Sequence, residues 1–198
     1  MDVNGNSPIH LVCKHLDFNK DDFHKFFDYH KGFNIDLAKL QNNEGQTPLH
    51  LATVEGKLDY VETMRNKKEP VKVNGQENKA GDSKALKRKK KQDDKEYKEA
   101  EQAFRTLVKV ADRENITALH LAAEYKHVEI VKILLAYSEN HKPGNNYGRT
   151  PLHIAAEFGA LDCMESIIQN VEVRNKGLGI KKLINIDGKD LQGNTPLA

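Results

Sequence analysis

The chain has 198 residues, of which 38% are hydrophobic and 30% are charged, and its formal net charge is +2. This length can bury one sizeable core or stack a handful of short repeats. No apolar run approaches the roughly 20 residues that a membrane-spanning helix needs, and the amino terminus lacks the basic start and apolar core of a secretion signal. The composition therefore predicts a soluble, polar chain with a cytoplasmic location.

One short motif recurs along the chain: a capping Ser or Thr, then Pro or Ala, an aliphatic residue and His. The capping residues are Ser7, Thr47, Thr117, Thr150 and Thr195, and the fifth copy has Ala in place of His. A Ser or Thr caps a helix, and Pro fits the first helical position. Gly precedes each cap by two residues except in the third copy, where Asn115 tolerates the same left-handed turn. Each copy predicts a tight turn followed by a short helix.

The interval between caps predicts the architecture. Thr117 and Thr150 are separated by one period of about 33 residues, which with a T-P-L-H-x-A core is typical of the ankyrin repeat. The other intervals between caps equal one such period plus an insertion. The chain therefore resembles an ankyrin-repeat protein everywhere except in the insertions. The resemblance implies an all-α solenoid of helix–turn–helix units with projecting β-hairpin fingers.

The expected helices follow from this period. The second helix of the first unit is expected from Lys20 to His30, and the second unit has its inter-helix turn at Gly56. The third unit predicts helices over 118–124 and 128–137. The fourth turns at Gly159 and continues with a helix over 161–168, and residues 177–181 are expected to form a loop.

An insertion interrupts the array after the second unit. The apolar pattern disappears over residues 66–94, and two Gly-containing pairs predict a flexible loop there. Residues 67–98 hold 12 Lys or Arg and 6 Asp or Glu, a local net charge of +6 that leaves −4 for the rest of the chain. The loop contains a basic run: Lys84, Lys87, Arg88, Lys89, Lys90 and Lys91.

The basic run is open to several interpretations. It suits a nuclear import signal or a contact for acidic partners, nucleic acid or anionic lipid, and it also suits a solvated charge run without a specific role. Nucleic acid is the less favoured partner, because the run lacks the interleaved aromatic residues of nucleic-acid platforms.

A second part of the insertion is expected to be a helix from about Asp93 to Ala111, where apolar residues recur at helical spacing. It either docks on the solenoid or forms the outer helix of a degenerate repeat, because the extra length before Thr117 is nearly one repeat period. We therefore divide the chain into repeats 1 and 2 over 1–66, the insertion over 67–111, and repeats 3, 4 and the start of a fifth over 112–198.

No residue pattern predicts catalysis, a metal or a cofactor. Four histidines occupy one position of successive repeats, where the resemblance implies a structural role: His10, His50, His120 and His153. They lack the paired Cys/His spacing of a zinc site. The two cysteines, Cys13 and Cys163, predict buried, reduced thiols. We expect a protein that is not an enzyme.

Partner-binding residues are expected at the finger tips and at the concave ends of the first helices. The resemblance maps them to Glu44, Gln46, Glu124, Tyr125, Tyr147, Arg149, Glu157 and Phe158. Aromatic residues and Arg are enriched in interface hot spots, and the acidic residues suit a partner with an apolar anchor and a basic flank. The sequence predicts a protein-interaction scaffold. The competing interpretation is that Tyr125 and Phe158 pack on the turn of the next repeat.

Two other functions stay open. The irregular spacing and the long connection over 182–197 are similar to the amino-terminal ankyrin domains of TRPA-type cation channels. The basic run also suits a nuclear regulator similar to inhibitor-type ankyrin proteins. Neither end shows the polar capping repeat that a solenoid needs, so we expect a fragment of a longer array.

Overall fold

A computed structural model describes residues 1–15, 39–65, 83–138, 144–178 and 188–197. The helices in these ranges are α1 (Pro8–His15), α4 (Pro48–Val54), α5 (Leu58–Arg65), α6 (Ser83–Val108), α7 (Ala118–Glu124), α8 (Val128–Tyr137), α9 (Pro151–Glu157) and α10 (Leu161–Leu178). The described part of the chain contains no strand, so the all-α prediction is confirmed. The expected helices over 118–124 and 128–137 have the predicted bounds.

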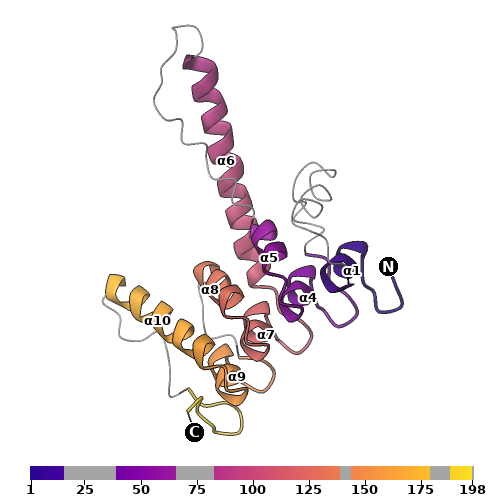
Figure 1. Ribbon diagram of the computed structural model, residues 1–198, viewed down its shortest axis with the longest axis vertical. Coiled ribbons are helices and arrows are strands. Elements are labelled where there is room, and N and C mark those ends of the chain that lie inside the picture. Colours follow the sequence, from indigo (N-terminus) through magenta and orange to yellow (C-terminus); the bar gives the residue numbers. More distant parts are fainter. Residues whose placement is uncertain (16–38, 66–82, 139–143, 179–187, 198) are drawn as a thin grey trace.

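The helices form two rows, which Figure 1 shows side by side. The inner row contains α1, α4, α7 and α9, and each of these helices contacts the next. The outer row contains α5, α8 and α10, which pack against their own inner helices. One apolar core runs between the rows, and both cysteines are free thiols buried in it. Burial raises the pKa of both thiols, which disfavours the reactive thiolate.

Each inner helix, α1 included, begins with a capping arrangement in which His replaces the usual Glu. At α4, the Nδ1 atom of His50 accepts a hydrogen bond from the backbone N–H of Thr47 at 3.1 Å and lies 2.8 Å from the Thr47 hydroxyl. The same pair of contacts recurs at the start of α7 and α9. Because His reaches back to the cap, the helix start is satisfied without an acidic residue.

The fingers are tight turns. The β-hairpins implied by the family resemblance are not confirmed: among the described residues there is one isolated antiparallel bridge, between Ala111 and Thr117. An Asp or Asn five residues before each cap closes the turn through its side-chain oxygen. Asp112, for example, accepts hydrogen bonds from the backbone N–H groups of Glu114 and Ile116, both at 2.8 Å. These side chains perform the role of a turn-closing Asx residue: Asp2, Asn42, Asp112, Asn145 and Asp190.

Left-handed backbone at the fingers explains the glycines of the motif. Asn115, the one exception, has a φ of 58°. At Gly148 the φ is 73°, and an added Cβ would lie 3.1 Å from the backbone nitrogen of Leu191 in the next finger. Glycine therefore serves both the turn and the close approach of the neighbouring finger.

The insertion differs from the sequence-based prediction. Helix α6 begins at Ser83, well before the expected start near Asp93, so the basic run lies on a helix and the prediction of a flexible loop is wrong for residues 83–94. Lys, Arg, Ala, Leu and Gln favour helix, and Gly81 is the last helix breaker before it. The carboxyl-terminal end of α6 packs between α5 and α8, where Phe104, Leu107 and Val108 are buried.

The inner row shows how the insertion relates to the array. Helices α4 and α7 contact each other directly, so no inner helix stands between them in the described part of the chain. This favours a docked helix over a degenerate repeat. The proposed domain boundaries at 66/67 and 111/112 stay a prediction.

Two further expectations concern loops and outer helices. Helix α10 continues to Leu178, so Gly177 and Leu178 are helical and the loop expected over 177–181 is wrong at these two positions. The rest of that loop and the helix expected from Lys20 to His30 lie outside the described residues.

Candidate interaction surface

The fingers form a continuous row, because each one donates a backbone hydrogen bond to the finger before it. The four donor–acceptor pairs are Asn43 N–H to Asn4 O (2.9 Å), Arg113 N–H to Glu44 O (3.1 Å), Asn146 N–H to Glu114 O (2.9 Å) and Leu191 N–H to Tyr147 O (3.0 Å). This row holds the finger-tip side chains at fixed positions relative to the inner helices.

The recurring histidines connect each repeat to the next finger. Since Nδ1 accepts a backbone N–H, the proton lies on Nε2, which donates to a carbonyl. The donor–acceptor pairs are His10 to Gln46 (2.9 Å), His50 to Ile116 (3.1 Å), His120 to Arg149 (3.1 Å) and His153 to Asn194 (3.3 Å). Burial lowers the pKa of His10 and His50, which keeps these rings neutral. The structure thus gives all four a structural role.

No group of three or more His, Cys, Asp or Glu residues suited to a metal ion occurs among the described residues. In that same part of the chain no helix is long and apolar enough to cross a membrane.

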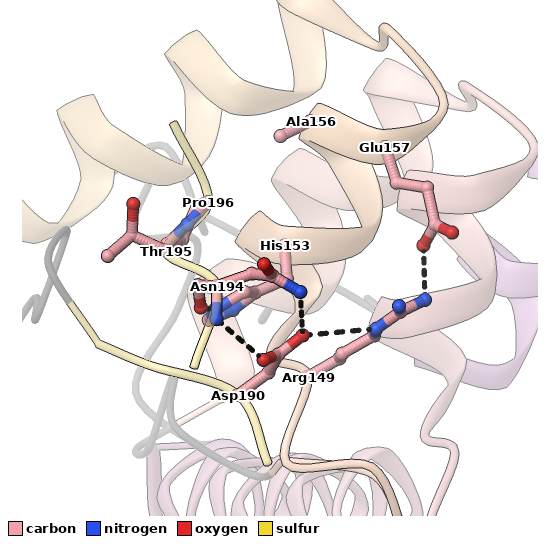
Figure 2. Close-up of a pocket in the computed structure, with 8 residues that line it drawn as sticks. All are labelled: Arg149, His153, Ala156, Glu157, Asp190, Asn194, Thr195 and Pro196. Atoms are coloured by element: carbon pink, nitrogen blue, oxygen red, sulfur yellow. Dashed lines mark hydrogen bonds and ion pairs between the residues drawn. The ribbon is translucent and has the colours of Figure 1, made fainter. Parts of the chain in front are cut away.

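Arg149 of the fourth finger contacts the end of α9 and the fifth finger. Figure 2 shows its guanidinium between two carboxylates. One terminal nitrogen lies 2.8 Å from Glu157 Oε2 at the end of α9, and Nε lies 3.4 Å from Asp190 Oδ2 in the fifth finger. Burial acts to raise the pKa of Asp190, but its hydrogen bonds to Asn194, Gln192 and Arg149 outweigh that effect and lower it. Arg149 therefore ties a finger to the far end of its own helix and to the next finger.

A cavity of about 260 Å³ opens beside this ion pair, between α9 and the fifth finger (Figure 2). Its lining consists of Arg149, His153, Ala156, Glu157, Asp190, Asn194, Thr195 and Pro196. Two carboxylates already neutralise Arg149, and His153 already bonds to Asn194 O. The cavity therefore offers little to an anionic ligand, and it lies where the fifth copy of the motif begins.

Three predicted aromatic residues are exposed in large part: Tyr125 by 46%, Tyr147 by 56% and Phe158 by 44%. Tyr125 and Phe158 each follow the last residue of an inner helix, at equivalent positions of repeats 3 and 4. Tyr147 lies in the fourth finger, at the other end of α9. The ring of Tyr125 stacks on His127 of its own repeat with centroids 6.3 Å apart. The competing interpretation, in which Tyr125 or Phe158 packs on the turn of the next repeat, stays open.

The ends of α7 and α9 also bring carboxylates together. The pKa of Glu124 is raised, first by burial and then by the charge of Glu157. These two acidic side chains and the aromatic residues beside them, Tyr125 and Phe158, form one patch at the ends of adjacent inner helices. We call these four residues the helix-end patch.

The predicted residues of the second finger have a mixed environment. Glu44 is exposed, but its carbonyl accepts the backbone bond from Arg113. Gln46 is half-buried, and its carbonyl accepts the bond from His10 while its side-chain oxygen lies 3.4 Å from Asn42 Nδ2. Binding roles for these two residues stay a prediction. The backbone carbonyl of Gln46 also takes part in the contact between the first two repeats.

Sequence reasoning missed Asp190 and the related finger residues. Their signal was available: an Asp or Asn stands five residues before every capping Ser or Thr. Only the structure shows that Asp190 also pairs with Arg149 of the fourth finger.

Comparisons with known proteins agree with the repeat geometry. Residues 96–177 match a family model described as ankyrin repeats (3 copies). Over 86 residues the chain is 35% identical to neurogenic locus notch homolog protein 1 of Xenopus laevis and of Homo sapiens, and 34% identical to that of Danio rerio. The matched stretch is 43% of this chain and 3% of each relative, so the chain spans only a small part of the relatives' length.

Proposed function

This chain is an ankyrin-repeat protein, and we propose that it acts as a non-catalytic scaffold that binds a protein partner on the concave side of repeats 3 and 4. Ankyrin repeats are a protein-interaction module, and the family is generally non-catalytic. The existence of a partner and its chemistry are part of this proposal, because a fold does not dictate its ligand.

The helix-end patch is the observation that carries the proposal. Tyr125 and Phe158 occupy positions that the repeat leaves free, and each exposes nearly half of its surface. Packing explains the buried residues of the motif, but it does not explain large aromatic side chains at these positions. Aromatic residues in such a patch are typical anchors of protein interfaces.

The electrostatics of the patch favour a particular partner chemistry. Burial is the main cause of the raised pKa of Glu124, and the charge of Glu157 adds to it, although Glu157 is also paired with Arg149. A Lys or Arg of the partner would stabilise the charged form of Glu124, while an apolar side chain would cover the aromatic rings. We therefore propose a partner segment with an apolar anchor flanked by a basic residue.

The test is capture by the full chain from a cell lysate, with the retained proteins identified by mass spectrometry. The double variant Tyr125→Ala, Phe158→Ala should lose at least about 30-fold in affinity for a captured partner, because a hot spot contributes about 2 kcal/mol or more. Its helical melting curve should match that of the unchanged chain, since both side chains are exposed.

A matched control is Leu161→Ala. Leu161 is also a large exposed apolar residue, but it begins the outer helix α10. This control should retain the partner. Undiminished capture by the double variant, or equal loss with the control, would reject the chosen face.

The two alternative functions and the location stay proposals. The likeness to TRPA-type channel domains is tested on the whole protein. The nuclear-regulator interpretation and the cytoplasmic location are tested by imaging the tagged chain in cells. For the nuclear interpretation, an unchanged distribution after changing residues 87–91 to Gln would exclude import by the basic run.

A further inference from the structure

Basic residues on α6 lie in a single line. They recur at intervals of three or four residues, which places them on one face of a helix: Lys84, Lys87, Arg88, Lys91, Lys95 and Lys98. We call this set the basic stripe. From its first to its last member the helix rises by about 21 Å, at about 1.5 Å per residue.

The described side chains of the basic stripe, from Arg88 to Lys98, lie on the face of α6 that is turned away from the array. The apolar side chains that anchor α6, such as Phe104 and Leu107, lie on the opposite face of the helix and are buried. Arg88, Lys91 and Lys98 are exposed, and the side chain of Lys95 is 75% exposed. Figure 1 shows the amino-terminal half of α6 projecting beyond the described repeat helices. A large binding partner can therefore reach the stripe.

The charges of the stripe oppose the stability of its own helix. The first turn of α6 contains no acidic residue, although the positive end of the helix dipole lies there. Like charges also stand at i, i+4, as with Lys91 and Lys95. An anion that lies along the stripe would remove both penalties, so binding and helix stability are coupled.

We infer that the basic stripe binds the phosphate backbone of double-stranded nucleic acid. A duplex carries about one phosphate per 3.4 Å of its axis on each strand, so the stripe of about 21 Å spans about six phosphates of a strand, and a straight helix contacts only part of them. A helix with side chains is about 10–12 Å wide, which fits a major groove about 12 Å wide. Residues 83–98 hold 8 Lys or Arg and 3 Asp or Glu, a net charge of +5 that leaves −3 for the rest of the chain, so the attraction is concentrated in this part of α6.

The surroundings of the stripe favour a duplex over an anionic membrane. Asp94, Glu99 and Glu101 flank its carboxyl-terminal half, and Glu99 lies 3.6 Å from Lys95. A line of phosphates can follow a narrow stripe between these carboxylates, whereas a membrane surface would bring anions against the carboxylates too. The basic face also lacks the apolar side chains with which an amphipathic helix enters a membrane.

The sequence alone disfavoured nucleic acid because the basic run lacks aromatic residues. That criterion applies to single strands, whose unpaired bases stack on aromatic rings. A duplex keeps its bases stacked and offers its phosphates, so lysines and an arginine in line are sufficient for contacts that do not depend on sequence.

The test is fluorescence anisotropy of a labelled DNA duplex of about 20 base pairs, titrated with the full chain between about 50 and 200 mM NaCl. Binding should weaken steeply with salt, with a slope of log affinity against log salt of about −0.9 for each phosphate contacted. The double variant Arg88→Gln, Lys91→Gln should reduce this slope by about two contacts and weaken binding at the lowest salt concentration by at least about tenfold.

The matched control is Lys89→Gln, Lys90→Gln, which removes the same charge from the same run but outside the stripe. It should weaken binding less than the stripe variant, and circular dichroism should show both variants folded. Equal losses in the two variants would overturn the stripe in favour of bulk charge. Absence of duplex binding would overturn the proposal. If the chain then sediments with vesicles of equimolar phosphatidylserine and phosphatidylcholine, the stripe binds an anionic membrane instead.

Discussion

The repeat junctions and α6 are held in place by different kinds of contact. At every junction the same pair of bonds recurs, one between finger backbones and one from a buried His to the next finger. Helix α6 makes no such repeated contact in the described part of the chain. It is attached by buried apolar side chains at its carboxyl-terminal end, while its basic end projects away.

The junction that carries the insertion shows what this difference means. The caps of repeats 2 and 3 stand much further apart in the chain than those of repeats 3 and 4. Even so, Arg113 bonds to Glu44 O at 3.1 Å and His50 to Ile116 O at 3.1 Å. The uninterrupted junction between repeats 3 and 4 has nearly the same distances. The insertion follows the outer helix α5, so its main cost to stability is loop-closure entropy, which grows slowly with length. The alignment of repeats 2 and 3 is therefore set by their contacts and not by the length of chain between them.

The largest expected effect tests the attachment of α6. Phe104→Ala should lower the free energy of unfolding by about 3–5 kcal/mol, because the ring is fully buried and meets Tyr137 edge-on with centroids 5.0 Å apart. Urea unfolding followed by circular dichroism measures this free energy. Lys95→Ala on the exposed side of the same helix should change the free energy of unfolding by less than about 0.5 kcal/mol. Similar values for the two variants would mean that α6 is not docked.

The next effect compares two junctions. His50→Ala and His120→Ala should each lower the free energy of unfolding by about 2–4 kcal/mol, because each leaves a buried cap and a finger carbonyl without a partner. The two losses should agree within about 1 kcal/mol despite the insertion at the first junction. A much smaller loss for His50 in urea unfolding would show that the insertion weakens its junction.

The smallest effect is a pH dependence that the junctions should have and α6 should lack. Burial holds the pKa of His10 and His50 below that of the unfolded chain, about 6.5. Below that pH the unfolded chain binds more protons, so stability is present above about pH 6.5 and falls as the pH decreases. The slope should reach at most about 1.4 kcal/mol per pH unit for each ring.

Urea midpoints at pH 7.5, 6.5 and 5.5 measure this slope. The pKa of Asp2 and Asp190 is lowered from 3.8, so these carboxylates contribute to pH dependence only at more acidic pH. His50→Gln should flatten the profile. A midpoint that does not change between pH 7.5 and 5.5 would contradict the neutral, buried state of the two rings.

Local signals predicted the repeats well. The caps and the Gly or Asn before them correctly placed the start of each inner helix, because a left-handed turn and a satisfied helix end depend on a few neighbouring residues. The same approach failed for residues 83–94. Charge and nearby glycines suggested a loop, but the run itself consists of good helix formers on a helix that continues into a docked end.

The candidate surface was only partly accessible to sequence reasoning. The offset within the repeat correctly placed Tyr125 and Phe158 at equivalent helix ends. It could not show that Arg149 bonds to Asp190 of the next finger, because side-chain reach between repeats depends on how they stack. It also could not show that the backbone carbonyl of Gln46 accepts a hydrogen bond from His10 of the preceding repeat.

The sequence by itself determined the repeat unit: where each turn and inner helix begins, and that one His recurs in each of the first four copies of the motif. These features depend on contacts within a few residues, for which spacing is sufficient. Tertiary structure alone decided that repeats 2 and 3 are neighbours, that α6 docks between α5 and α8, and that Arg88, Lys91, Lys95 and Lys98 are exposed. Such outcomes depend on which apolar surfaces meet, and residues far apart in the chain supply those surfaces together.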